Sequence, residues 1–346
     1  MKITEDTSQK IKNMSIICAL LVVAIHVTWP YDGGPSFTWF IHHVVQEGVA
    51  KIAVPFFFVV SGFFLSLHMD EEGWFDGEVC KRLHSLVVPF FVWIIIATIF
   101  VAPMQIVLDI IAHRPFGFLP HFSNGRWVAT LGLDPRCGPS YCGVLWYVRC
   151  LFCFVLIAPV FKWLVLKGGV VWLVCAFLVS FLHMTLSPFP PFLQKSLEFG
   201  FSLSGVFYFS LGIYIGLSKA PRCPRWLLVP CALGGLGLLV ISVMASTKGG
   251  HDGLVTLANP LLMYATWSLM PTSKWPKAVT SLSFPVFLLH VPILLYLAPF
   301  MKYTPLGGSQ FESVVVFLGT LALSVLVIVV VKRFPRINVL LFAGRS

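Results

Sequence analysis

Ten apolar runs divide this chain, and each is close to the length that an α-helix needs to cross a bilayer. A helix rises about 1.5 Å per residue, so roughly 20 predominantly apolar residues span the hydrocarbon core of about 30 Å. The sequence therefore predicts an all-α, polytopic membrane protein with about ten transmembrane helices. The runs lie at about 14–29, 49–67, 86–107, 143–161, 170–186, 199–217, 227–246, 254–271, 281–301 and 313–331.

The composition agrees with this prediction. Hydrophobic residues make up 58% of the 346 residues and charged residues only 11%, whereas a soluble domain is about 25% charged. The net charge of +10 is explained by Lys and Arg that collect in cytoplasmic loops. No basic stripe with interleaved aromatic residues lies outside the apolar runs, so we expect the lipid bilayer, and no nucleic acid, as a partner.

Charge placement predicts the orientation. The first run is followed by Trp29 and Pro30 and not by a small-residue cleavage site, which favours a retained helix over a secretory signal. With a cytoplasmic N-terminus, sixteen of the 24 Lys and Arg residues fall in cytoplasmic segments and seven in outer segments. This bias predicts a multi-pass protein of the cell (plasma or inner) membrane with both termini cytoplasmic. Residues 1–346 are expected to form one transmembrane domain without a soluble domain.

Three ionisable residues lie inside apolar runs on different predicted helices: His26, Arg149 and His290. Such residues are costly in the bilayer and usually face a bundle interior or a wet cavity. Each is 13 or 14 residues from a cytoplasmic lysine, which for straight helices corresponds to a depth of about 20 Å. A common depth favours a shared central polar cavity over three unrelated placements. For His26 taken alone, a hydrogen bond to a neighbouring helix or a position at the level of the lipid headgroups explains its placement equally well.

The longest predicted connection, at about 108–142, lies on the outer side and is either a lid or binding element or a surface loop. Cys137 and Cys142 fall on it, where an oxidising compartment would permit a disulfide that the sequence cannot establish. Cys150 and Cys153 form a CxxC pair, but no second pair or nearby histidine accompanies it, so no metal site is expected.

Six motifs occur in order along the chain: VVAIHV, PFFFVVSGFFL, RLHSLVVPFF, LWYVRCLF, FYFSLGIYIG and SFPVFLLHVPIL. In these motifs and in its helix number the chain resembles the acyltransferase 3 family of ten-helix integral membrane acyltransferases, over about residues 10–335. The resemblance implies transfer of an acyl group, commonly acetyl, from cytoplasmic acyl-coenzyme A to a hydroxyl of a glycan or glycolipid. Acyl-coenzyme A, preferably acetyl-coenzyme A, is then the expected co-substrate, and the expected acceptor is a carbohydrate or lipid-linked glycan, as in O-acetylation of a polysaccharide.

The resemblance also implies the site residues. His26 matches the family's first-helix histidine, which is regarded as catalytic, and His290 matches its late histidine. Trp146 and Arg149 match the tryptophan-containing motif of the fourth helix. Because acyl transfer needs a base for the acceptor hydroxyl and stabilisation of an oxyanion, we assign His26 as general base. Arg149 is expected to stabilise the oxyanion or bind a coenzyme A phosphate, and His290 to orient or assist.

Donor binding is expected at the cytoplasmic ends of the helices. Arg82 matches the arginine that opens the third helix and is placed to hold phosphates, and Ser61 with Gly62 matches the SG motif of the second helix. Ordinary helix packing is the alternative for the Ser-Gly pair. Many family members carry an arginine eleven residues before the first-helix histidine, where this chain has Ser15, and Lys12 is the expected substitute.

Two further function classes remain open from the residues. A small-molecule transporter or glycan flippase would also suit ten helices and midplane polar groups, but no inverted repeats are visible. A structural membrane scaffold explains histidines within the bilayer poorly.

Overall fold

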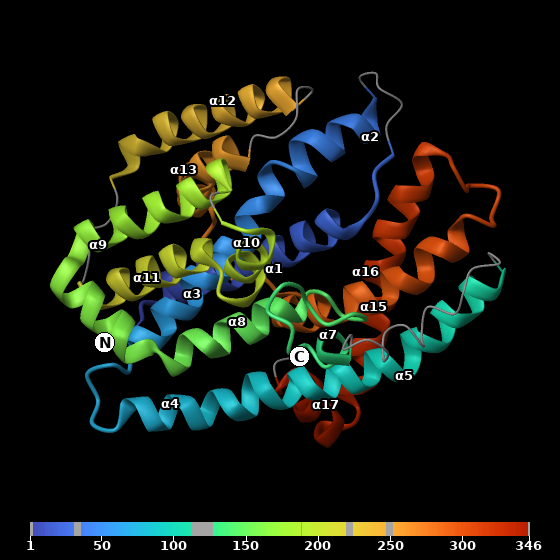
Figure 1. The fold of residues 1–346 in the computed structure, drawn as a ribbon, viewed down its shortest axis with the longest axis horizontal. Helices are drawn as coiled ribbons and strands as arrows, with labels where there is room; N and C mark the ends of the chain where they lie inside the picture. The colour runs from blue at the N-terminus through green and yellow to red at the C-terminus, as the bar shows by residue number, and fades with distance from the viewer. Residues whose placement is uncertain are drawn as a thin grey trace. The chain divides into compact units, whose positions relative to one another are not determined.

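The computed structural model describes residues 3–30, 36–111, 127–187, 189–218, 224–246 and 252–344. Every regular element in these ranges is a helix and none is a strand (Figure 1), which confirms the predicted all-α class. The chain divides into two compact units, and each is described by itself. Unit 1 comprises residues 1–78, 156–190 and 203–283, and unit 2 comprises residues 79–155, 191–202 and 284–346.

Within the described ranges, eight helical segments are long and apolar enough to cross a membrane, where the sequence predicted ten. The two other predicted runs are also helical, but α8 (Leu145–Leu156) has only 12 residues. α13 (Asp252–Leu269) contains Pro260 and is not among the candidate spans. The eight spans are Glu5–His26, Phe37–Ser66, Trp74–Met104, Ala158–Leu186, Pro191–Leu217, Arg225–Ala245, Ser283–Met301 and Gln310–Lys332.

The second and third spans begin well before the predicted positions because each starts with a short α-helix, which π-helical or 3-10 segments join to the main helix. The second consists of α2 (Phe37–Phe40), η1 (Ile41–Gln46), η2 (Val49–Ile52) and α3 (Ala53–Ser66). The third consists of α4 (Trp74–Arg82), η3 (Leu83–Val87) and the part of α5 (Val88–Ile111) that ends at Met104. Both η1 and η3 are π-helices, which are rare and are frequently found at functional sites.

The depth estimate for the polar residues assumed straight helices, and that assumption is wrong in two of three cases. α1 (Glu5–His26) does connect Lys12 to His26 without a break. In contrast, α8 is separated from α9 (Ala158–Leu186) by the non-helical Ile157, between Arg149 and Lys162. α9 bends again at Gly169, whose φ of 49° is a conformation that favours glycine. A turn also separates α14 (Lys277–Thr280) from α15 (Ser283–Met301), between Lys277 and His290.

Unit 1 is organised by the close approach of α3 and α11 (Leu203–Leu217). A Cβ on Gly62 would lie 2.1 Å from the Phe209 carbonyl oxygen, and one on Gly212 would lie 2.0 Å from the Val59 carbonyl oxygen. Small residues at such positions let two helix backbones pack directly against each other. Gly62 therefore serves helix packing, which was the alternative to donor binding for the Ser61–Gly62 pair.

The other elements of unit 1 cover this pair. α1 packs on α3, α9 packs on α11 and α13, and α12 (Leu228–Ser246), which follows η5 (Arg225–Leu227), packs on α13 (Figure 1). A small apolar cluster fills the space where η2 meets α12 and α13; its buried members are Ile52, Leu239, Ala258 and Leu262.

Unit 2 packs α5 and α16 (Gln310–Lys332) against the short helix α17 (Pro335–Phe342). The indole nitrogen of Trp93 donates to the Leu341 carbonyl oxygen at 2.9 Å. An apolar hollow of about 690 Å³ lies among α5, α15, α16 and α17. The unit also contains α7 (Trp127–Thr130), α10 (Pro191–Lys195) and the π-helix η4 (Ser196–Gly200).

Large apolar side chains remain exposed along the long helices of both units. Val171 on α9, Leu233 on α12 and Phe311 on α16 are 71%, 66% and 69% exposed. Exposing rows of large apolar side chains to water is unfavourable, whereas contact with lipid chains is favourable. The exposed faces of these helices therefore agree with a membrane-embedded protein.

Candidate functional site

His26 lies in the last turn of α1, in unit 1, and its side chain is exposed. Its Nδ1 is 2.8 Å from the Val22 carbonyl oxygen. Because a carbonyl can only accept, this hydrogen bond requires the proton on Nδ1. A neutral His26 then carries its lone pair on Nε2, which is the arrangement that a general base needs.

The last turn of α1 is held by side chains from outside the helix. The indole nitrogen of Trp29 donates to the Ala24 carbonyl oxygen at 3.0 Å, and Nε2 of Gln46 donates to the Ile25 carbonyl oxygen at 2.7 Å. The last four carbonyls of a helix have no partner within it. Trp29 and Gln46 therefore satisfy two of them and fix the turn that carries His26.

The cytoplasmic half of α1, in the predicted orientation, is also tied down. Nδ2 of Asn13 donates to the carbonyl oxygens of Pro271 and Ser273, both at 3.0 Å, and Asn13 is fully buried. Gln9 donates to Asn13 at 2.9 Å. Ser15 bonds back to the Ile11 carbonyl oxygen at 2.7 Å. Lys12 is exposed and is thus available to a ligand at this end.

Ser61 is half-buried on α3, next to the close contact that Gly62 makes with α11. Arg82 is half-buried at the end of α4, in unit 2. The expectation that Arg82 opens the third helix is wrong in one respect, because the helical segment already begins at Trp74. Arg82 instead lies directly before the π-helix η3.

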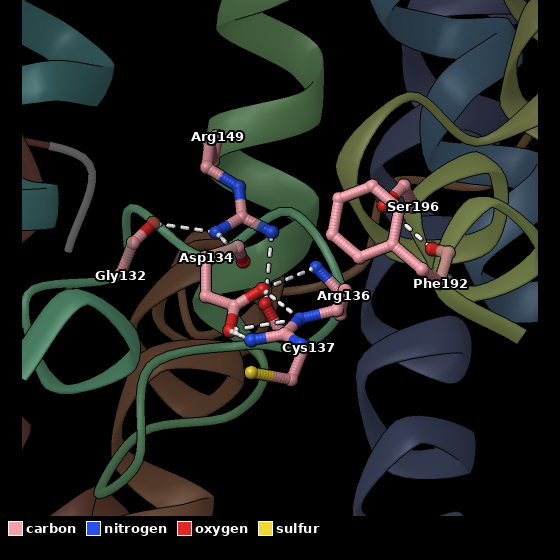
Figure 2. Close-up of polar contacts among 7 residues, drawn as sticks. All are labelled: Gly132, Asp134, Arg136, Cys137, Arg149, Phe192 and Ser196. Atoms are coloured by element: carbon pink, nitrogen blue, oxygen red, sulfur yellow. Dashed lines mark hydrogen bonds and ion pairs between the residues drawn. The ribbon is translucent and has the colours of Figure 1, made fainter. Parts of the chain in front are cut away.

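Arg149 lies in the second turn of α8 and reaches into the connection at 131–144 (Figure 2). Its guanidinium donates to the carbonyl oxygens of Gly132 at 2.5 Å, Asp134 at 2.7 Å and Cys137 at 2.8 Å. A longer bond of 3.4 Å reaches the carbonyl oxygen of Phe199 in η4. Both terminal nitrogens thus bind two backbone carbonyls each, which uses all four of their N–H groups.

An ion pair closes the turn that Arg149 organises. The guanidinium of Arg136 binds the Asp134 carboxylate through Nε at 2.8 Å and through a terminal nitrogen at 2.5 Å, and it lies 5.5 Å from the ring centre of Phe192. Bonding to Arg136 lowers the pKa of Asp134 below its usual value. Asp134 therefore stays ionised at neutral pH.

Cys137 and Cys142 are both free thiols in the structure, Cys137 half-buried and Cys142 buried. Burial raises the pKa of Cys137, and raises that of Cys142 to about 12. A raised pKa keeps a thiol protonated and unreactive. Residues 112–126 of the same predicted connection lie outside the described residues.

His290 is fully buried on α15, in unit 2. Its Nδ1 is 3.2 Å from the Val286 carbonyl oxygen, which repeats the arrangement at His26. A line of aromatic rings connects α8 to this histidine: Tyr147 packs against Phe287 at 5.7 Å, and Phe287 packs against His290 at 6.1 Å between ring centres. Arg149 and His290 therefore lie on two helices of unit 2 that are in contact.

The expected catalytic residues are thus divided between the units: His26 in unit 1, and Arg149 and His290 in unit 2. The shared polar cavity stays a prediction. In the part of the chain that is described, no group of three or more His, Cys, Asp or Glu residues is placed to hold a metal ion.

Three residues around His26 were missed from sequence. Gln46 and His42 fell in a segment assigned to a connection, and Trp29 was assigned only to the end of a run. Their signal was present, because His42 and Gln46 are four residues apart within the mostly apolar stretch FTWFIHHVVQ. Polar residues at this spacing share one face of a helix. The segment is short and lies between two more strongly apolar runs, so hydropathy alone does not distinguish it from a connection.

Comparison with known families gives one finding. A family model described as an acyltransferase domain, acyltransferase 3, matches residues 10–333, nearly the whole chain. No curated protein and no solved structure gives a match.

Proposed function

The chain belongs to the acyltransferase 3 family of membrane-bound acyltransferases, and on that premise we propose which acyl group it moves and where. The proposed donor is acyl-coenzyme A on the cytoplasmic side, with acetyl as the acyl group. The proposed acceptor is a hydroxyl of a cell-surface glycan or glycolipid precursor. The protein would then lie in the plasma or inner membrane with both termini in the cytoplasm, as the distribution of Lys and Arg indicates.

The observation that carries this proposal is the state of His26. Its Nδ1 proton is committed to the Val22 carbonyl, its side chain is exposed, and its helix end is held by Trp29 and Gln46. A histidine with one nitrogen fixed as a donor presents the other as a directed proton acceptor. This supports His26 as the general base of the transfer.

The reaction follows from that assignment. Nε2 of His26 takes the proton of the acceptor hydroxyl as its oxygen attacks the thioester carbonyl. The resulting tetrahedral oxyanion collapses, the carbon–sulfur bond breaks, and the imidazolium returns the proton to the coenzyme A sulfur. The products are the acylated glycan and free coenzyme A thiol. A neutral imidazole is regenerated, so no residue stays modified.

The other site residues receive supporting roles. The four terminal N–H groups of Arg149 are bound to backbone carbonyls, which favours organisation of the 131–144 connection over direct contact with an oxyanion or phosphate. His290 is proposed to orient or assist from α15. Arg82, Ser61 and Lys12 are proposed to bind the coenzyme A arm, with the two cations at its phosphates.

The test uses purified protein in proteoliposomes with labelled acetyl-coenzyme A and extracted envelope glycans. Release of free thiol should require both the protein and an acceptor, and mass spectrometry should find an added acetyl group on the glycan. We expect His26→Gln to lower kcat by about 10²–10⁴-fold, the usual contribution of a general base. His183→Gln is the matched control, because it makes the same change within another span of unit 1.

Two outcomes would contradict the proposal. Near-normal turnover by His26→Gln would remove His26 as the base. Movement of glycan across the bilayer without release of thiol would instead indicate a flippase. Arg82→Gln tests the donor site separately, because it should weaken acetyl-coenzyme A binding while leaving acceptor binding unchanged.

A further inference from the structure

The C-terminal end of α1 lacks the glycine C-cap that commonly ends a helix. Val27 follows the last residue in an extended conformation, with φ −75° and ψ 135°, and no glycine follows it to turn the chain back onto the free carbonyls. The carbonyls of Ala24 and Ile25 are bound instead by the side chains of Trp29 and Gln46. Both bonds fall within the turn that ends at His26.

Gln46 is itself fixed in one orientation. The atom facing the Ile25 carbonyl must be the amide nitrogen, because two oxygens would repel each other, and the amide oxygen then faces Nδ1 of His42 at 3.0 Å. His42 lies four residues earlier, on the π-helix η1. With its Nδ1 proton donated to Gln46, His42 holds the amide so that its N–H points at α1.

The orientation of the His26 ring depends on the geometry of this last turn. Its Nδ1 binds the Val22 carbonyl one turn earlier, and this bond exists only while the last turn keeps helical geometry. Helix ends fray easily when their carbonyls lack partners. Loss of the Gln46 bond would therefore free Ile25, loosen the turn and allow the imidazole to rotate or to change tautomer.

We propose that Gln46 is a positioning residue for His26, that His42 orients Gln46, and that Trp29 holds the adjacent carbonyl. This inference rests on the proposed role of His26 as general base. Neither Gln46 nor Trp29 is proposed to touch a substrate; both act through the geometry of the helix end. Their effect should appear in the catalytic step and not in the binding of either substrate.

The first variant is Gln46→Met, which keeps the length of the side chain and removes its donor. We expect kcat to fall about tenfold with both KM values unchanged, because a small displacement of a catalytic group slows the chemical step. Gln46→Glu should behave similarly, since it keeps the acceptor for His42 but has no proton for the Ile25 carbonyl. Gln9→Met is the matched control: it removes another glutamine hydrogen bond on α1, far from His26, and should leave kcat unchanged.

A second pair of variants, one test and one control, checks the same positioning role if Gln46→Met does not fold. Trp29→Phe removes the indole bond to Ala24 and should lower kcat, whereas Trp172→Phe removes an equivalent indole bond to Ser210, also in unit 1, and should not. Thermal unfolding of all variants in detergent separates folded from unfolded protein.

A spectroscopic measurement decides the question independently of activity. In protein labelled with ¹⁵N-histidine, the His26 signals are identified by their loss in His26→Gln. Above the imidazole pKa, wild-type Nε2 should show the chemical shift of an unprotonated nitrogen, and Gln46→Met should show a mixture of both tautomers. An unchanged His26 tautomer together with an unchanged kcat in Gln46→Met would overturn the positioning role. If His26→Gln stayed active, the base assignment would fall, while the tautomer measurement would still decide whether Gln46 positions the ring.

Discussion

At the scale of single residues, polar side chains in this protein act mainly by binding backbone carbonyls. Arg149 binds four of them, Asn13 binds two, and Trp29 and Gln46 bind one each. A carbonyl without a partner costs far more in a membrane than at a wet surface. These residues therefore hold together places where a helix ends or a connection folds back.

The ion pair between Asp134 and Arg136 gives a pH prediction at this scale. The pKa of Asp134 is lower in the folded protein than its ordinary value of about 4. Its contribution to stability is therefore complete above that value and is lost as the pH falls through the folded pKa. Asp134→Asn should lower the unfolding temperature in detergent at pH 6, and the difference from wild type should shrink toward pH 3. A difference that stays constant over this pH range would show that the carboxylate charge plays no part.

At the scale of elements, contacts between backbones decide how unit 1 packs. Gly62, Gly212 and Gly216 lie at the contact of α3 with α11, and a Cβ on any of them would meet an atom of the other helix within 2.1 Å. Such contacts allow extensive van der Waals packing between helices, which is the main attraction available when lipid is the solvent. The Ser-Gly pair of α3 thus has a structural reason for its glycine.

Gly212→Val tests this packing. The added Cβ would approach the Val59 carbonyl oxygen to 2.0 Å, so α3 and α11 would have to separate. We expect a destabilisation of at least about 1–3 kcal/mol, the usual cost of overpacking, measured as a lower unfolding temperature. Gly237→Val on α12 is the control, because among the described residues no atom beyond the backbone of its own helix lies within 4 Å of the Cβ position. Equal unfolding temperatures for the two variants would contradict a close α3–α11 contact.

At the scale of the whole molecule, the proposed chemistry draws on both compact units. His26 belongs to unit 1, and His290 belongs to unit 2 together with Arg149 and Arg82. The family match over residues 10–333 includes residues of both units.

A double variant tests whether the two histidines serve one reaction. Residues that act as a unit give losses that do not add, because the second substitution removes nothing that the first has left. We expect His26→Gln combined with His290→Gln to have about the same kcat as His26→Gln alone. A double variant whose loss equals the product of the two single losses would indicate independent roles.

The sequence alone was sufficient for the fold class and for the family. Long apolar runs leave a chain few choices in a bilayer, since each must satisfy its own backbone within a helix, and each of the ten predicted runs contains a helix within the described residues. The runs could not show that α8 ends after 12 residues, that α9 bends at Gly169, or that π-helices join short α-helices to the second and third spans. Those features depend on local backbone geometry, to which a hydropathy pattern is insensitive.

For the candidate site too, some features could be predicted from the sequence and others depended on the tertiary structure. His26, Arg149 and His290 stand out in the sequence because charge is rare at membrane depth. That Arg149 binds four carbonyls, and that Gln46 and Trp29 hold the turn bearing His26, was decided by tertiary structure. Those partners are up to 50 residues apart along the chain, and only folding brings a donor to a particular carbonyl. Residue type therefore determined where chemistry is possible, and the bonds between helix ends and distant side chains determined how those residues are held.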